Sequence, residues 1–268
     1  MTFAKQFALE GKVALVTGGG TGLGRAIAEG FLAAGCSRVY IASRKAEAIA
    51  AAAHKIDSNG RCVAVAVDLS NLAGVSALAD AIAEREARLD ILVNNAGLAW
   101  GAPFDHYPER GWDKVFGLNL KAPFFLIQAL LGLLRAGGSP EDPARVINIG
   151  SIAGEMAKGT TTYSYGLSKS ALHHMTRMLA LDLGSSNITV NTIAPGRFAS
   201  PLTASIVDDP ERHAREAAMV PLGRWGTTAE LGSIAIFLAS PAAAYVTGAT
   251  LVADGGLSLQ HPINLGME

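Results

Sequence analysis

The sequence predicts a doubly wound α/β fold, in which helices cover both faces of a parallel sheet of about seven strands. Short runs of β-forming apolar residues recur along the 268-residue chain, and helix-length segments separate them. The runs are continuously apolar, as in strands buried on both faces. Because α/β folds of this length often form one domain, we expect a single domain over residues 1–268, with a substrate lid at about 198–222.

The predicted elements follow in order along the chain. The strands are Val13–Thr17, Arg38–Ser43, Cys62–Asp68, Leu89–Asn94, Arg145–Ile149, Ile188–Ala194 and Ala249–Ala253. Leu23, Ile27 and Phe31 have helical spacing after the first strand. Ala122–Leu134 is apolar nearly all round, which predicts a helix buried against a partner subunit. Phe198–Leu222 has no strand pattern and is interpreted as a mobile substrate lid.

Composition excludes several classes of protein. The net charge is −1, with 50% hydrophobic and 17% charged residues, so neither a nucleic acid nor an anionic membrane is an expected partner. The longest uncharged stretch, Leu231–Ala253, is interrupted by Pro241 and Gly248, which argues against a membrane segment. Cys36 and Cys62 lack a zinc-site spacing, the six histidines are scattered, and the N-terminus carries charges. We expect a cytoplasmic protein without a metal.

A glycine-rich turn links the first strand to the first helix, as in a dinucleotide-binding Rossmann fold. Its glycines follow the pattern GxxxGxG from Gly18 to Gly24, and Gly19 lies within it. Such a turn lets the backbone approach a pyrophosphate at a helix N-terminus. A flexible loop is the alternative. The predicted cofactor-binding residues in this turn are Thr17, Gly18, Gly20, Thr21, Gly22 and Leu23.

The end of the second strand indicates which dinucleotide binds. A carboxylate there would accept hydrogen bonds from a ribose 2′-hydroxyl, but the sequence has Ser43 and Arg44, which suit a 2′-phosphate. NADP(H) is therefore the predicted cofactor, and a solvated basic turn is the alternative. Asp68 closes the third strand where the adenine would lie, although an aspartate there is also an ordinary helix N-cap.

A tyrosine and a lysine form the predicted catalytic pair. Tyr165 and Lys169 are four residues apart, so a helix places them on one face, where the ammonium would lower the pKa of the phenol. Tyr163 is the weaker candidate. Ser151 follows a strand whose end should open into the cofactor crevice, and its hydroxyl could hold a carbonyl oxygen. Asn119 lies in an apolar helical pattern, which predicts a structural or relay partner for its amide.

Taken together, these motifs resemble the short-chain dehydrogenase/reductase family over nearly the whole chain. The marks, in order, are Thr17–Gly24, Asp68, Asn94-Asn95-Ala96-Gly97, Asn119, Ser151, Tyr165-xxx-Lys169, Pro195-Gly196 and Asp254-Gly255-Gly256. One departure is the spacing of fourteen between Ser151 and Tyr165, one more than expected, which indicates an insertion within Gly154–Thr162. Ser200 stands where relatives often have threonine.

The resemblance implies a role for each member of a catalytic tetrad. Tyr165 would donate a proton to a carbonyl, Ser151 would orient that carbonyl, Lys169 would bind ribose hydroxyls, and Asn119 would hold a relay water. It also implies that further residues contact the cofactor. These are Leu69, Asn94, Asn95, Ala96, Gly97, Ile193, Pro195, Gly196, Phe198 and Ser200, together with Tyr165 and Lys169.

Within the family, several segments are similar to the 3-oxoacyl reductase branch associated with bacterial rhamnolipid synthesis. Among them are Gly111–Val115 and Gly223–Gly226. This implies a 3-oxoacyl thioester or related ketone as the small-molecule substrate. A carrier protein would need a basic face, for which the candidates are Arg197, Arg212, Arg215 and Arg224, although ordinary surface charge is the alternative.

Other functions and the assembly state remain open from the sequence. One alternative enzyme is an alcohol dehydrogenase or ketoreductase acting on free cyclic, aromatic or steroid-like ketones. A second alternative is an NADP-binding sensor without catalysis, against which the intact tetrad argues. The family resemblance implies a homotetramer or a dimer, and the C-terminal stretch Gln260–Glu268 is either a loose tail or a subunit contact.

Overall fold

The computed structural model describes residues 3–157 and 161–259. Its centre is a seven-stranded sheet in the order β3-β2-β1-β4-β5-β6-β7, in which every neighbouring pair is parallel. The predicted fold class is confirmed. The strands are β1 (Val13–Thr17), β2 (Arg38–Ser43), β3 (Cys62–Ala66), β4 (Ile91–Asn94), β5 (Ala144–Ile149), β6 (Ile188–Pro195) and β7 (Thr250–Ala253).

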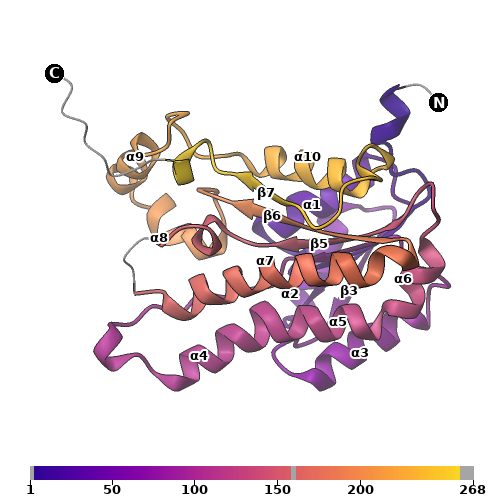
Figure 1. The fold of residues 1–268 in the computed structure, drawn as a ribbon, viewed down its shortest axis with the longest axis horizontal. Coiled ribbons are helices and arrows are strands. Elements are labelled where there is room, and N and C mark those ends of the chain that lie inside the picture. The colour runs from indigo at the N-terminus through magenta and orange to yellow at the C-terminus, as the bar shows by residue number, and fades with distance from the viewer. Residues whose placement is uncertain (1–2, 158–160, 260–268) are drawn as a thin grey trace.

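Helices lie between the strands in sequence and on both faces of the sheet in space (Figure 1). The chain order reverses between β1 and β4, which opens a crevice beyond the carboxyl ends of these strands. The helices are α1 (Gly22–Ala33), α2 (Ala46–Ile56), α3 (Leu72–Ala83), α4 (Glu109–Phe116), α5 (Ala122–Ala129), α6 (Leu131–Gly137), α7 (Tyr163–Leu183), α8 (Ala204–Val207), α9 (Pro210–Ala218) and α10 (Thr228–Ala239).

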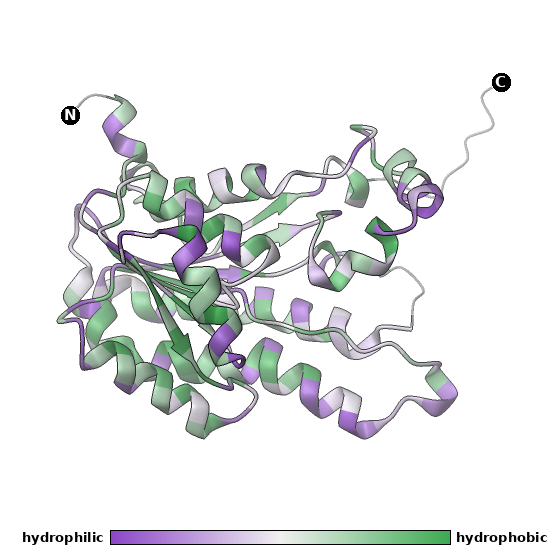
Figure 2. Ribbon diagram, turned by 180° about the vertical axis from the view of Figure 1, so that it is seen from behind, coloured by the Kyte–Doolittle hydropathy of each residue, from purple (hydrophilic) through white to green (hydrophobic). Residues whose placement is uncertain are grey.

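Alternate residues of each central strand face opposite hydrophobic cores. In β1, Ala14 and Val16 join a core with α1, α2 and α10, whereas Val13 and Leu15 join a core with α3, α5, α6 and α7. The strands are accordingly hydrophobic along their length, and hydrophilic residues lie mainly on the outer helices and loops (Figure 2). Burial on both faces explains why the strand sequences do not alternate.

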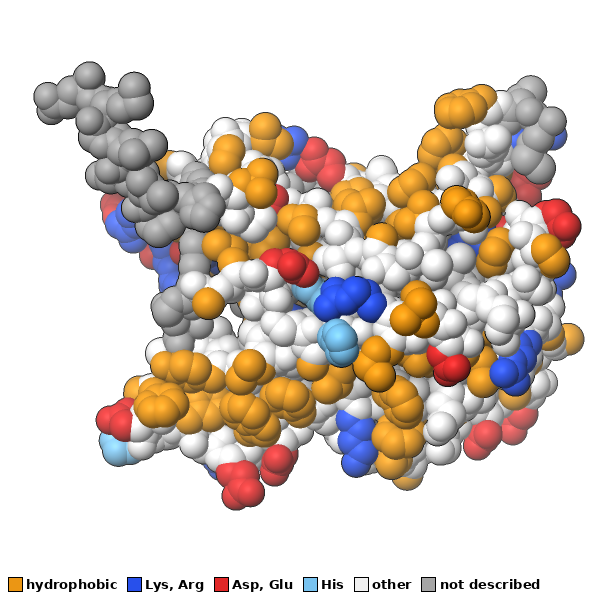
Figure 3. All heavy atoms as spheres, viewed as in Figure 1, with side chains coloured by type: hydrophobic (Ala, Val, Ile, Leu, Met, Phe, Trp, Pro, Cys, Tyr) orange, Lys and Arg blue, Asp and Glu red, His pale blue; other side chains and the backbone are white. Residues whose placement is uncertain are grey.

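The predicted single helix over Ala122–Leu134 is wrong in detail. A π-helical segment, Gly117–Lys121, precedes α5, and the helix breaks at Leu130, where α6 begins after a bend of 62°. Leu126, Leu130 and Leu134 are buried against the sheet of the same chain, so intramolecular burial accounts for most of the apolar pattern. Phe124 remains exposed, and hydrophobic side chains gather over α4 and α5 (Figure 3).

The predicted lid segment is helical rather than irregular. It contains the 3-10 turn η6 (Pro201–Thr203), α8 and α9; Ser200 and Thr203 form a capping box at η6, and the Asp209 side chain caps α9. The two ends of the segment meet. The amide of Gly226 donates to the carbonyl of Arg197 at 2.9 Å, and Phe198 pairs with Gly226 in an isolated bridge.

Neither a single membrane-spanning helix nor a cluster of metal-ligating side chains is found within residues 3–157 and 161–259. No single helix in these ranges is long and apolar enough to cross a membrane, although the bent pair Glu109–Ala129 and Leu131–Gly137 passes on length and composition. No cluster of three or more His, Cys, Asp or Glu side chains in the same ranges is arranged to hold a metal ion. The stretch Gln260–Glu268 and part of the expected insertion, residues 158–160, lie outside the described residues.

Candidate active site

The turn after β1 is shaped to receive an anion. Gly18 and Gly22 adopt positive φ angles of 65° and 53°, which glycine tolerates without strain. A Cβ on Gly24 would lie 2.5 Å from the carbonyl oxygen of Gly18, so this contact needs glycine. Within the described residues, the side chain of Thr21 at the N-cap of α1 caps none of the first-turn amides. These amides are available to a bound phosphate.

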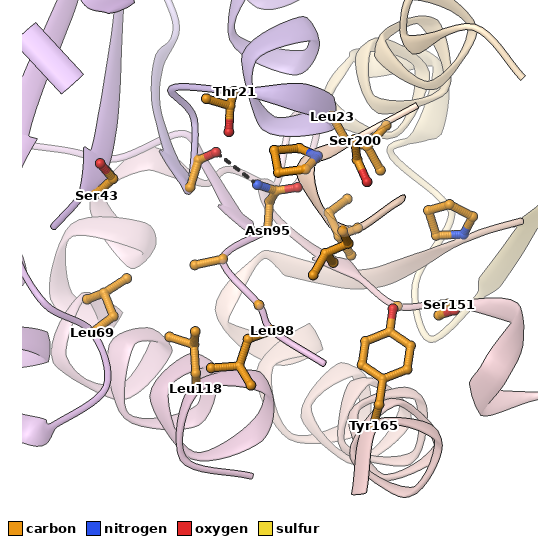
Figure 4. Close-up of a pocket in the computed structure, with 18 of the residues that line it drawn as sticks. Thr21, Leu23, Ser43, Leu69, Asn95, Leu98, Leu118, Ser151, Tyr165 and Ser200 are labelled. Atoms are coloured by element: carbon orange, nitrogen blue, oxygen red, sulfur yellow. Dashed lines mark hydrogen bonds between the residues drawn. The ribbon is translucent and has the colours of Figure 1, made fainter. Parts of the chain in front are cut away.

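Thr17 and Asn95 tie this turn to the segment after β4. The Thr17 hydroxyl accepts hydrogen bonds from the amides of Asn95 and Ala96 at 2.9 and 3.0 Å. The Asn95 amide donates in return to the carbonyls of Thr17 and Gly18 at 2.9 and 3.2 Å (Figure 4). Thr17 is buried and does not line the pocket, so its part is to hold the two walls of the crevice together.

A single pocket runs along the carboxyl ends of the strands and gathers most of the predicted site residues. Figure 4 shows Ser43 and Leu69 at one side and Ser151 and Tyr165 at the other. The predicted residues that line it are Gly18, Thr21, Leu23, Ser43, Arg44, Asp68, Leu69, Asn95, Ala96, Gly97, Ser151, Tyr165, Lys169, Pro195, Gly196, Phe198 and Ser200.

Other predicted residues lie behind the pocket wall. The backbone of Gly20 packs near Ile49, and that of Gly22 packs near Pro201. Buried Asn94 donates to Asn148 at 2.9 Å, and Ile193 is part of the core. These predicted residues do not line the pocket themselves and support the residues that do.

The pocket also includes residues that the sequence analysis did not select. Leu98 directly follows Gly97, and Leu118 precedes Asn119 in the π-helical segment, so adjacency to a selected residue was an available signal for both. Most of the remaining residues also neighbour a predicted residue in the sequence, but their small or apolar side chains carry no chemical signal of their own. The remaining residues are Ala42, Val67, Ser70, Ile149, Gly150, Pro201, Leu202 and Thr203.

At the end of β2, Ser43 and Arg44 line the pocket together with Asp68. Ser43 is half-buried and Arg44 is exposed. Asp68 lies across from them at the end of the third strand, where its Oδ1 accepts from the amide of Ser70 at 3.0 Å. This hydrogen bond, with the nearby Arg44 charge, lowers the pKa of Asp68, so that the group is a carboxylate at neutral pH.

The proposed catalytic side chains converge at the other end. The Tyr165 hydroxyl is hydrogen-bonded to the Ser151 side chain, and the Lys169 ammonium lies 5.7 Å from the centre of the Tyr165 ring. The Lys169 Nζ atom donates to the carbonyl of Ile149 at 2.7 Å. The i, i+4 spacing on α7 and the loop after β5 therefore bring a phenol, a hydroxyl and an amine together.

Burial dominates the pKa values in this cluster. It lowers the pKa of Lys169 to about 8, because the charged ammonium loses hydration. Burial also raises the pKa of Tyr165, and the hydrogen bond with Ser151 offsets part of this rise. The sequence-based expectation that Lys169 lowers the tyrosine pKa is thus not met in this arrangement, because the ammonium is directed at the Ile149 carbonyl rather than at the phenol oxygen.

The side chain of Asn119 is held by three hydrogen bonds. Its side-chain amide donates to the Leu98 carbonyl at 2.9 Å and to the Ser168 hydroxyl at 3.1 Å, and it accepts from the Leu98 amide at 3.0 Å. The predicted need for a partner is therefore satisfied. These bonds join the π-helical segment to the pocket wall and to α7.

The basic residues considered for a carrier protein differ in their availability. Arg197 pairs with Glu216, and Arg224 pairs with Glu230 at 2.6 Å, so these guanidinium groups already have carboxylate partners. Arg212 and Arg215 are exposed on α9.

Comparison with known proteins identifies the family to which the chain belongs. A family model described as Enoyl-(Acyl carrier protein) reductase matches residues 18–258. The chain belongs to the short-chain dehydrogenase/reductase family, and it is an oxidoreductase of that family, as the sequence motifs predicted.

Among its relatives is the rhamnolipids biosynthesis 3-oxoacyl-[acyl-carrier-protein] reductase of Pseudomonas aeruginosa, which is 51% identical over 94% of this chain and 98% of its own length. The predicted likeness to that branch is confirmed. The solved Pseudomonas aeruginosa RhlG/NADP active-site complex superposes with a TM-score of 0.92, with 51% identity over 95% of this chain and 99% of that chain. A 2-dehydro-3-deoxy-D-gluconate 5-dehydrogenase of Escherichia coli is 38% identical over 93% of this chain and 96% of its own.

Proposed function

We propose that this protein is an NADP(H)-dependent ketoreductase that reduces a 3-oxoacyl thioester to its 3-hydroxy product. The observation that supports this proposal most directly is one pocket. The glycine turn, which can bind an anion, and Arg44 lie at one end of it, and Ser151, Tyr165 and Lys169 lie at the other. The cofactor is NADP(H), which the RhlG complex also contains. When bound, it supplies the hydride for the carbonyl carbon.

Side chains of the protein would carry out the proton transfer and orient the substrate. The Tyr165 hydroxyl donates its proton to the ketone oxygen, for which its raised pKa keeps it protonated at neutral pH. The Ser151 hydroxyl, bonded to Tyr165, orients the same oxygen. The Lys169 ammonium donates to the Ile149 carbonyl and lies 5.7 Å from the centre of the Tyr165 ring, so its charge would stabilise negative charge on the tyrosine oxygen through space rather than by a hydrogen bond, an effect that strengthens in a water-poor pocket. Asn119 keeps the Leu98 wall and Ser168 in register.

Pocket chemistry supports an acyl substrate over a sugar acid. Among the described lining residues, the charged side chains are Arg44, Asp68 and Lys169, and the first two lie at the Ser43 end. A sugar-acid carboxylate near Tyr165 would need a further cation, whereas the apolar side chains of Leu98 and Leu202 suit an acyl chain. The relative named as a 3-oxoacyl reductase is also more similar than the one named for a sugar acid.

The test is an oxidation assay of NADPH and of NADH with purified protein. The substrates are an acetoacetyl thioester, a panel of free ketones and a ketogluconate, and the variants are Tyr165→Phe and its matched control Tyr163→Phe. Tyr163 packs edge-on against Phe104 outside the pocket. We expect thioester turnover with NADPH, a loss of about 10²–10⁴-fold in Tyr165→Phe, and none in the control.

Other outcomes assign other functions. Turnover of the ketogluconate alone would indicate a sugar-acid dehydrogenase, and turnover of free ketones alone would indicate a general carbonyl reductase. Tight NADPH binding without turnover of any substrate would support a sensor.

The cofactor choice has a separate test. Arg44→Ala should raise the KM for NADPH by about tenfold or more and leave that for NADH unchanged, since a charge-assisted bond to the 2′-phosphate is lost. Lys45→Ala is the matched control, because this neighbouring exposed lysine does not line the pocket. Equal effects of the two variants would argue against recognition of the phosphate by Arg44.

Assembly as a dimer or tetramer is part of the same proposal. Phe124 on α5 and Met178 and Leu181 on α7 are exposed, and Leu181 is 88% exposed. Exposed apolar side chains of this size on neighbouring helices are typical of interfaces between subunits. Light scattering after size-exclusion chromatography gives the mass, and a purely monomeric solution would contradict this part of the proposal.

A further inference from the structure

One buried ionisable side chain near the pocket has no part in the mechanism above. His173 lies one turn beyond Lys169 on α7 and is only 2% exposed. It packs against the loop that carries Ser151. Its Nε2 atom is 3.4 Å from the amide nitrogen of Ser151, and its Nδ1 atom is 2.6 Å from Oε1 of Glu155.

These two contacts fix the tautomer of the ring. A backbone amide can only donate, so the Nε2 atom of His173 must be unprotonated and accept from Ser151. The Nδ1 atom then carries the hydrogen and donates to the carboxylate of Glu155. Burial lowers the pKa of His173, and the positive charges of Lys169 and Arg177 lower it further, against the opposing effect of Glu155. The imidazole is therefore neutral at pH 7, as this pattern requires.

The loop backbone is built around the ring. A Cβ on Gly150 would lie 2.1 Å from the Nε2 atom of His173, and a Cβ on Gly154 would lie 2.8 Å from its Cε1 atom. Neither position has room for a side chain while the ring is in place. The Ser170 hydroxyl adds a second tie from α7, because it donates to the Gly154 carbonyl at 2.6 Å. Contacts from Ser170 and His173 thus attach the loop to the helix that carries Tyr165.

We propose that Glu155 and His173 form a positioning pair, which holds the loop from Gly150 to Glu155 on α7 so that the Ser151 hydroxyl faces Tyr165. The inference rests on the proposed ketoreductase function. The pair does not touch the substrate. It acts through the Ser151 amide, and Glu155 sets the direction of the imidazole by accepting its hydrogen. Because Ser151 lies at the Tyr165 end of the pocket, the pair should affect turnover much more than affinity for the cofactor.

Glu155 provides the cleaner test, since its side chain is 41% exposed and its replacement should leave the fold intact. Glu155→Ala removes the acceptor of the His173 hydrogen, whereas Glu155→Gln keeps an acceptor oxygen without the charge. We expect Glu155→Ala to lower kcat about tenfold, since small misplacements of a catalytic group can cost up to about 10²-fold. KM and the Kd for NADPH should change by less than about twofold, and Glu155→Gln should recover kcat to within about threefold.

Two additional variants complete the experiment. His173→Leu should lower kcat at least as much as Glu155→Ala, and combining them should add little, because both break the same tie. Asp182→Ala, an exposed carboxylate on α7, is the matched control and should behave as wild type. Melting temperature and NADPH affinity are measured for every variant.

The outcomes separate this inference from the proposed function. If the wild-type enzyme reduces a ketone but Glu155→Ala has wild-type kcat, the positioning role is wrong. Parallel losses of kcat, NADPH affinity and melting temperature in Glu155→Ala, without recovery in Glu155→Gln, would show a purely structural role and also overturn it. If the wild-type protein binds NADPH but reduces none of the tested ketones, the proposed function itself fails.

Discussion

Near the amino ends of the strands, Lys12 and Arg145 both pair with Asp142. At the carboxyl ends, the ammonium of Lys169 donates to the carbonyl of Ile149 and lies over the Tyr165 ring, and within the described residues it has no salt bridge to a carboxylate. The Lys12–Asp142 and Arg145–Asp142 distances are 2.6 and 2.9 Å. Arg145 is fully buried and also donates to the carbonyl of Ser240 at 3.1 Å. The positive charges of Lys12 and Arg145 are thus compensated by a carboxylate, while that of Lys169 has no carboxylate partner in the part of the chain that the structure describes.

We infer from this difference that the carboxyl end of the sheet, where the proposed catalytic residues lie, contributes less to the stability of the fold than the amino end. Burial lowers the pKa of both Lys169 and Arg145, but the Asp142 carboxylate opposes this effect at Arg145, whereas burial is the cause at Lys169. A buried charge with several partners, such as Arg145, holds the strand starts together. Replacing the buried charge by methionine should therefore have opposite effects at the two ends: at Lys169 it should lower activity and raise stability, and at Arg145 it should lower stability and leave activity unchanged.

The largest expected effect is at Lys169. Lys169→Met should lower kcat/KM by about 10²–10⁴-fold, because the developing charge on Tyr165 loses its stabilising ammonium. The same change should raise the free energy of unfolding by about 1–3 kcal/mol, since it replaces a poorly compensated buried charge with an apolar chain. Activity assays and urea unfolding at pH 7 measure both. A destabilised variant would contradict the comparison.

Arg145 should respond in the opposite way. Arg145→Met leaves the Oδ1 atom of Asp142 and the carbonyls of Pro143 and Ser240 without this donor, while Lys12 still pairs with Oδ2. We therefore expect a loss of about 2–4 kcal/mol in unfolding free energy. The kcat of the folded fraction should be unchanged, because the residue lies at the end of the sheet away from the pocket. Chemical unfolding and active-site-normalised kinetics test this, and a loss of kcat at unchanged stability would refute it.

The pH dependence should also follow Lys169. Because its pKa lies near 8, the amine is charged below and neutral above this value, so kcat/KM for reduction should fall about tenfold per pH unit above about 8. The stability advantage of Lys169→Met should shrink over the same range, since the wild-type amine becomes neutral and its burial less costly. A flat kcat/KM profile between about pH 7 and 9.5 would contradict the assignment.

The smallest effect is expected at Asp90, which is buried at the start of the sheet. Its Oδ2 atom accepts from the amide of Val13 at 2.7 Å and lies 3.4 Å from the Nε atom of half-exposed Arg88. Asp90→Asn keeps an acceptor for the Val13 amide, so we expect a loss below about 1 kcal/mol in urea unfolding. A loss above about 2 kcal/mol would mean that the charge itself, rather than the hydrogen bond, matters there.

Local patterns in the sequence predicted the parts of the molecule that depend on short-range spacing. The i, i+4 relation of Tyr165 and Lys169 and the strand–turn–helix around Gly18 are of this kind. The break at Leu130 depends instead on how α5 and α6 pack on the sheet, which the run of apolar residues does not encode. The direction of the Tyr165 pKa and the Glu155–His173 contact depend on burial and on side-chain orientation, so the sequence alone did not indicate them.

The joined ends of the lid have an evolutionary consequence. Because Gly226 bonds to Arg197 and would clash with Phe198 if it carried a Cβ, the segment between them leaves and re-enters the scaffold at one point. A loop closed at its base can change in length at little entropic cost to the rest of the chain. Residues 198–226 thus form a module that gene recombination or a protein engineer could exchange between relatives. Because Phe198 and residues 200–203 line the pocket, such an exchange would change one pocket wall while Ser151, Tyr165 and Lys169 stay in place.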